Sequence, residues 1–142
     1  MGKLKVLCVD DDNATVTIIS AVLTKEGYEV ATALDGHDGL KKALEMKPDL
    51  IILDIMMPDI DGYEVCRQLK RHTDTENIAV LMLTAKGGID ENVKENWQVA
   101  SRVNDRNKGF DVGATEFLTK PVKAKDLIQR VKAVLWASGK AN

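Results

Sequence analysis

The chain has 142 residues, of which 44% are hydrophobic and 30% charged, values that fit one globular domain. A formal net charge of −2 and the lack of a basic run give no reason to expect nucleic-acid binding. The apolar stretches are far shorter than the roughly 20 residues that cross a bilayer, and residues 1–5 lack a secretory apolar core, so we expect a cytoplasmic protein without membrane contact. Cys8 and Cys66 lack a CxxC or histidine partner and are predicted to be reduced core thiols.

Short apolar runs alternate with segments of helical periodicity along the whole chain. This alternation predicts a parallel sheet covered by helices on both faces, an α/β doubly wound fold. We expect one domain over residues 1–142, with its core at about 5–136 and a frayed tail at 137–142. Strands are predicted near residues 5–9, 29–33, 50–53, 79–83 and 116–119, and helices near 13–26, 36–46, 62–72 and 124–136, with a long helical stretch between the last two strands.

Four of the predicted strands end in residues that can do chemistry. Ligands of open α/β folds bind at the carboxyl ends of the strands, so side chains placed there can meet in one site. The first, third, fourth and fifth strands end in Asp10-Asp11-Asp12, Asp54, Thr84-Ala85 and Lys120-Pro121, respectively.

Each of these residues has a plainer interpretation when it is taken alone. Acids at positions 10–12 suit a helix N-terminus, and we expect Asp12 to be an N-cap. Thr84 suits a helix cap, and Lys120 suits a solvated surface. Only the common position at successive strand ends favours a site over these alternatives.

The set of strand-end residues closely resembles the receiver domain of two-component response regulators, over about residues 5–136. The resemblance implies the sheet order 2-1-3-4-5, which places the acids of the first and third strands together. It also implies that Asp54 is the phosphoryl acceptor and that the Lys120–Pro121 bond is cis. The remaining implied roles are Mg²⁺ binding by Asp10, Asp11, Asp54 and the main-chain carbonyl of Met56, phosphoryl binding by Thr84, Ala85 and Lys120, and switching by Thr84 and Phe117.

The implied chemistry explains why these residue types are needed together. A phosphoryl group carries spread negative charge, so a carboxylate that accepts it needs cations nearby. Mg²⁺ is a hard ion that prefers oxygen ligands, and Lys120 adds a second positive charge. In the loop after Asp54, we expect Asp59 and Asp61 to form turns rather than to bind a ligand.

The chain departs from the family in two places. Many receivers carry Tyr where this chain has Phe117, so any signal relayed there must use ring packing without a hydroxyl. Between Thr84 and Lys120 the chain is longer than usual by about 14 residues, close to four helical turns. We interpret residues 88–108 as an insertion that elongates the fourth helix rather than forming a disordered loop, because apolar residues recur there at helical spacing. These residues are Ile89, Val93, Trp97, Ala100 and Val103.

The favoured function is a signalling switch, in which the phosphohistidine of a sensor kinase or phosphotransfer protein donates to Asp54. The change then alters binding to a downstream protein, or to a second copy of the chain, through the fourth helix, fifth strand and fifth helix. The alternatives are an Mg²⁺-dependent aspartyl-phosphate phosphohydrolase and a constitutive interaction domain. The phosphohydrolase would need a second acid at position 56, where this chain has Met56.

The predicted apolar stripe of the insertion, which includes Ile89, Val93, Trp97 and Val103, extends beyond what a receiver sheet of ordinary size covers. Exposed apolar patches mark contact sites, and tryptophan often dominates their energetics. We therefore expect Trp97→Ala to weaken association, measured by light scattering, while phosphorylation of Asp54 and thermal stability stay nearly unchanged. A large loss of stability without a change in association would instead place Trp97 in the core.

Overall fold

Five parallel strands form the centre of the computed structural model, which describes residues 2–85 and 116–140. The strands lie in the order β2-β1-β3-β4-β5, so the doubly wound fold and the sheet order are both confirmed. The predicted elongated fourth helix lies outside the described residues. The elements are β1 (Lys5–Val9), α1 (Asn13–Lys25), β2 (Glu29–Ala33), α2 (Gly36–Met46), β3 (Leu50–Asp54), α3 (Gly62–Arg71), β4 (Ala79–Thr84), β5 (Glu116–Thr119) and α5 (Ala124–Ala137).

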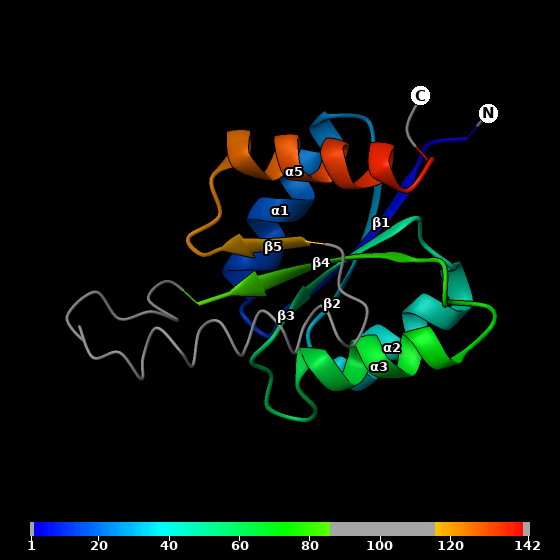
Figure 1. Cartoon of the computed structure of the whole chain (residues 1–142). Coiled ribbons are helices and arrows are strands. Elements are labelled where there is room, and N and C mark those ends of the chain that lie inside the picture. Colours follow the sequence, from blue (N-terminus) through cyan, green and yellow to red (C-terminus); the bar gives the residue numbers. More distant parts are fainter. Residues whose placement is uncertain (1, 86–115, 141–142) are drawn as a thin grey trace, which may run out of the picture.

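The helices cover the sheet in two layers, with α1 and α5 on one face and α2 and α3 on the other (Figure 1). Side chains that alternate along each strand fill the two cores in turn. In β1, for example, Val6 and Cys8 pack toward α1 and α5, whereas Leu7 and Val9 pack toward α2 and α3. Because both faces are covered, the central strands are apolar along their whole length rather than alternating with polar residues.

Local chemistry accounts for the helix ends. The Asp12 carboxylate accepts a hydrogen bond from the backbone N–H of Ala14, which confirms Asp12 as the N-cap of α1. Gly27 follows α1 with a φ of 99°, a conformation that residues with a Cβ rarely adopt. The Asp61 carboxylate caps α3 by accepting from the N–H of Glu64. Among the residues described, none of the helices has the length and apolar character that a bilayer crossing requires.

Both cysteines are buried, as predicted, and neither forms a disulfide bond within the described residues. Burial raises the pKa of both thiols, that of Cys66 to about 11. A thiol with a raised pKa is largely protonated near neutral pH and reacts poorly. The two side chains therefore belong to the packed core.

Residues 138–140, in the tail that the sequence predicts to be frayed, make hydrogen bonds to the rest of the fold. The backbone N–H groups of Ser138 and Lys140 bond to carbonyls of α5. The Lys140 Nζ donates to the main-chain oxygens of Asp49 and Asn77 at 2.8 and 2.7 Å, at the loops that lead into β3 and β4. The prediction rests on the small, polar residues of the tail. Such a composition does not reveal that the lysine at position 140 contacts two loops elsewhere in the fold.

Lys140→Ala should lower the free energy of unfolding by about 1 kcal/mol, because two hydrogen bonds to main-chain carbonyls are exchanged for bonds to water. Urea denaturation measures the change. Lys125→Ala, at an exposed position in the first turn of α5, is the matched control and should cost less than about 0.5 kcal/mol. Equal effects of the two substitutions would show that the Lys140 contacts do not stabilise the fold.

Candidate functional site

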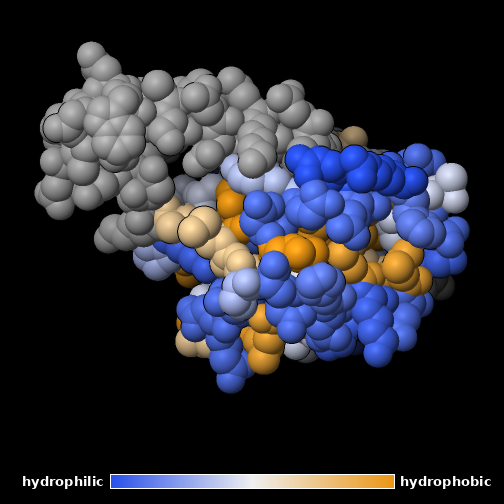
Figure 2. Space-filling model, turned by 90° about the horizontal axis from the view of Figure 1, so that it is seen from below, coloured by the Kyte–Doolittle hydropathy of each residue, from blue (hydrophilic) through white to orange (hydrophobic). Residues whose placement is uncertain are grey.

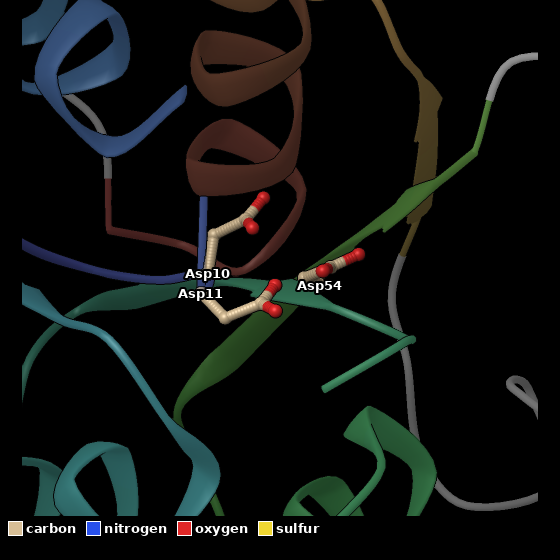
Figure 3. A group of neighbouring side chains, drawn as sticks. All are labelled: Asp10, Asp11 and Asp54. Atoms are coloured by element: carbon tan, nitrogen blue, oxygen red, sulfur yellow. The ribbon is translucent and has the colours of Figure 1, made fainter. Parts of the chain in front are cut away.

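Three carboxylates meet at the carboxyl edge of the sheet (Figure 3). Asp10 and Asp11 follow β1, and Asp54 is the last residue of β3, which pairs directly with β1. One oxygen from each carboxylate lies within 4.8 Å of the others. Asp10 is fully buried and Asp54 is 4% exposed, whereas Asp11 is exposed. The structure thus brings together the three acids that the sequence placed at strand ends.

Lys120 supplies a positive charge to this cluster. Its Nζ lies 2.7 Å from Asp10 Oδ2 and 3.5 Å from Asp54 Oδ1, and its side chain is 23% exposed. Burial alone would lower its pKa, but the hydrogen bond to Asp10 and the charges of both acids outweigh this effect and raise it. The Lys120–Pro121 bond is cis, as predicted. The backbone N–H of Lys120 donates to the carbonyl of Thr84 at 2.8 Å, which ties the ends of β5 and β4 together.

The charge of Asp54 is only partly compensated. Burial and the neighbouring charge of Asp10 raise the pKa of Asp54 from 3.8 to about 6, while Lys120 and a hydrogen bond from the backbone N–H of Met56 oppose the rise. Desolvation and like charge both disfavour an ionised carboxyl group. Additional positive charge at this position would therefore be stabilising.

The other predicted site residues belong to the end of β4, to β5 and to the loop after β3. Thr84 ends β4, and its hydroxyl lies 3.4 Å from that of Thr119, a neighbour that sequence reasoning missed. Ala85 is exposed directly after Thr84. Met56 is 72% exposed, and its backbone N–H donates a hydrogen bond to the Asp54 carboxylate. Phe117 is buried in the core on the α2 and α3 side of the sheet.

One contact near the site had no signal in the sequence. Asp59, which the sequence predicts to be a turn-former, accepts hydrogen bonds from the backbone N–H groups of Gly36 and His37 at the start of α2. The residues involved are more than 20 positions apart. Only an observed correlation between the two positions, or the structure itself, could have revealed the contact.

The donor set fits a hard divalent cation. Carboxylate and main-chain oxygens are the ligands that Mg²⁺ prefers in proteins, and Asp10, Asp11 and Asp54 each offer one such oxygen. The raised pKa of Asp54 indicates that a cation at this position would relieve repulsion. Within the described residues, the side chains of Asp10, Asp11 and Asp54 form a group of acids that lie close enough together to hold a metal ion.

Comparison with known proteins agrees with the geometry. Residues 6–132 match the response regulator receiver domain family. The chain is 40% identical over 131 residues to the DNA-binding dual master transcriptional regulator RpaA of Synechocystis, which covers 92% of this chain and 48% of that protein. It is 42% identical over 131 residues, with the same coverage, to the alkaline phosphatase synthesis transcriptional regulatory protein PhoP of Bacillus subtilis. The chain thus spans about half the length of these relatives.

Solved structures show the same fold. The chemotaxis protein CheY4 of Vibrio cholerae superposes with a TM-score of 0.79 at 30% identity, covering 94% of this chain and 100% of that one. A response regulator receiver domain protein from Clostridium thermocellum gives a TM-score of 0.78 at 28% identity, with 96% and 97% coverage.

The sequence match and the fold define the class, and the chain belongs to the response regulator receiver domain family. Its members are regulatory domains that accept a phosphoryl group in phosphorylation-dependent signalling, and their main role is not that of an enzyme. The resemblance inferred from the strand ends is therefore confirmed. The family assignment disfavours the phosphohydrolase alternative.

In metal-free protein, Asp54→Asn should stabilise the fold by on the order of 2 kcal/mol at about pH 7.5 and by much less at about pH 4.5. The pKa of about 6 in the folded state lies above the ordinary 3.8, so the folded protein holds this proton more tightly than the unfolded chain. Wild-type stability therefore falls as the pH rises through this interval, and the uncharged Asn avoids the loss.

Urea unfolding in the presence of a chelator measures this difference at the two pH values. Asp12→Asn is the matched control, because the Asp12 carboxylate is exposed and caps α1 outside the cluster. A gain for Asp54→Asn that is the same at both pH values would contradict the raised pKa.

Proposed function

We propose that this chain is a phosphorylation-controlled switch in which Asp54 accepts a phosphoryl group from a sensor histidine kinase or a phosphotransfer protein. The observation that carries the proposal is the cluster of Asp10, Asp11 and Asp54, joined to the Lys120 ammonium at the carboxyl edge of the sheet. The proposal keeps the cytoplasmic location expected from the sequence.

The metal would be Mg²⁺, held by Asp10, Asp11, Asp54 and the main-chain carbonyl of Met56. When bound, it would neutralise the negative charge that the phosphoryl group brings to the acidic edge. The carboxylates already lie close enough together to share one ion. The burial of Asp10 and Asp54 strengthens the electrostatic attraction of these two carboxylates to a cation.

The chain's own residues position the reaction. A carboxylate with a pKa of about 6 is mostly ionised at neutral pH, so Asp54 needs no general base before it attacks. An Asp54 oxygen forms a bond to phosphorus while the P–N bond of the phosphohistidine breaks, and the imidazole leaves with that electron pair. Lys120, the Thr84 hydroxyl and the backbone of Ala85 would bind the phosphoryl oxygens, which stabilises charge without reorganisation.

The phosphorylated site would signal through the strands that carry it. Thr84 and Lys120 are already joined by a main-chain hydrogen bond, so a shift of either residue toward the phosphoryl group would move the ends of β4 and β5 together. Phe117, buried in β5, would relay the change by ring packing. The receiving surface would include the predicted insertion at residues 88–108, which would bind a downstream protein or a second copy of the chain.

Asp54 should gain one phosphoryl group from acetyl phosphate when Mg²⁺ is present and none in EDTA, because the cation offsets the charge of the acidic cluster. Asp54→Asn should abolish the gain, and Asp12→Asn should retain it. Intact-mass spectrometry measures the modification. Equal labelling of wild type and Asp54→Asn would refute the acceptor assignment, and no labelling of wild type by any donor would favour a constitutive interaction domain.

A further inference from the structure

The loop of residues 55–61 connects Asp54 to α3 and is closed tightly at its base. The backbone N–H of Gly62 donates to the carbonyl of Ile55 at 2.8 Å. A Cβ added to Gly62 would lie 2.5 Å from the main-chain oxygen of Asp54, so a glycine is needed for this approach. The main chain of Met56, inside the loop, already donates a hydrogen bond to the Asp54 carboxylate. The conformation of the loop therefore bears directly on the acceptor.

Asp59 fastens the far side of this loop to the start of α2. Its Oδ1 accepts from the backbone N–H of Gly36 at 2.9 Å, and its Oδ2 accepts from that of His37 at 2.8 Å. The His37 Nδ1 also lies 2.7 Å from Asp59 Oδ2. The Asp59 side chain is 23% exposed. One carboxylate thus makes three contacts with α2, although it belongs to a different segment of the chain.

A packing contact reinforces the same connection. Ile60 lies so close to Gly36 that a Cβ at position 36 would collide with the Ile60 side chain. The same Cβ would also lie 3.1 Å from a methyl group of Val65 in α3. The loop and the start of α2 are therefore joined by apolar contact as well as by hydrogen bonds.

The charge at this contact is well matched. Although burial tends to raise the pKa of Asp59, hydrogen bonds from the backbone N–H groups of Gly36, His37 and Ile60 hold it well below its ordinary value. The positive end of a helix dipole favours an anion at the same place. Asp59 is therefore ionised when the hydrogen bonds are made.

The N-terminus of α2 has a separate cap of its own. The Asp35 carboxylate, directly before the helix, accepts from the N–H of Asp38 at 2.7 Å. Capping of the helix start from within the segment is therefore already provided. The Asp59 carboxylate has a different effect from that of Asp35: it joins the start of α2 to the loop that follows Asp54.

We propose that Asp59 is a positioning residue for the phosphorylation site, which holds the Met56 main chain beside Asp54 by fastening the 55–61 loop to α2. This inference rests on the proposed function, because it is there that the Met56 carbonyl serves as a metal ligand. Asp59 itself touches neither the ion nor the phosphoryl group. Its removal should leave the three acids in place and loosen the main-chain part of the site.

Titration calorimetry with Mg²⁺ tests the proposal on the 142-residue chain in four versions: wild type, Asp59→Ala, Asp59→Asn and Asp35→Ala. Loss of a residue that orients a metal ligand typically weakens metal binding by at least tenfold, so we expect about a tenfold weaker Kd for Asp59→Ala. Asp59→Asn keeps one carbonyl acceptor and should fall between this variant and wild type. Asp35→Ala destabilises the same helix start without touching the loop and should bind Mg²⁺ like wild type.

Hydrogen exchange of the Met56 amide in metal-free protein gives a second readout. Exchange should be faster in Asp59→Ala than in wild type or Asp35→Ala, because the Met56 hydrogen bond to Asp54 opens more often when the loop is released. This measurement needs no bound metal. If Asp59→Ala does not fold, the same comparison between Asp59→Asn and Asp35→Ala decides the question.

The outcomes separate this inference from the proposed function. Wild type that binds Mg²⁺, together with an Asp59→Ala variant whose Kd and Met56 exchange are unchanged, would overturn the inference alone. Equal loss of affinity in Asp59→Ala and Asp35→Ala would assign Asp59 a structural role in α2 and would also overturn it. Wild type that binds no Mg²⁺, or binds it equally after Asp11→Asn, would overturn the metal site of the proposed function and the inference with it.

Discussion

The attraction between one ammonium group and two buried carboxylates is the interaction on which this site depends. Asp10 and Asp54 have little contact with water, and two such charges side by side repel each other strongly. Lys120 lies between them, closer to Asp10 than to Asp54. One positive charge does not balance the three acids of the cluster, and the pKa of Asp54 remains raised to about 6. Because of this residual imbalance, additional positive charge at this edge of the sheet would be stabilising.

The burial of the central strands fixes the positions of the Asp10 and Asp54 carboxylates. β1 and β3 lie between two helical layers (Figure 1). Their side chains pack into the two cores, and Val9 pairs with Leu53 immediately before the acids. A slip of one residue would turn the apolar side chains of a strand to the opposite core. Packing therefore fixes the register, and the register fixes the separation of Asp10 from Asp54. The electrostatic cost of the cluster is offset by apolar burial elsewhere in the same strands.

Side chains on the outer surface of the protein hold loops in place but do not belong to the acidic cluster. In the view from below, hydrophilic residues cover most of the described surface, and hydrophobic residues gather mainly across its middle (Figure 2). Elsewhere, charged side chains fasten loops to neighbouring elements: Asp59 binds the start of α2, and Lys140 binds the loops before β3 and β4. In each case one side chain satisfies two main-chain groups. Such contacts hold the connections of the sheet in place around a rigid centre.

The sequence alone determined the elements of this protein and the chemistry at their ends. Apolar runs and helical periods predicted the five strands and the four helices of the described residues to within a few residues, because burial on both faces demands continuous apolar strands. The acids at positions 10, 11 and 54 were visible because they interrupt those runs. The sheet order came from the family resemblance, since periodicity carries no information about which strands are neighbours.

Tertiary structure decided which of these residues touch. Local sequence patterns could not predict three of these contacts. Lys120 lies nearer Asp10 than Asp54, Asp59 binds α2, and Lys140 binds two loops. The contacting residues are separated by 22 to 91 positions in the cases of Asp59 and Lys140. Contacts of this kind depend on how whole elements pack against one another, and the propensities of a short segment contain no record of that packing.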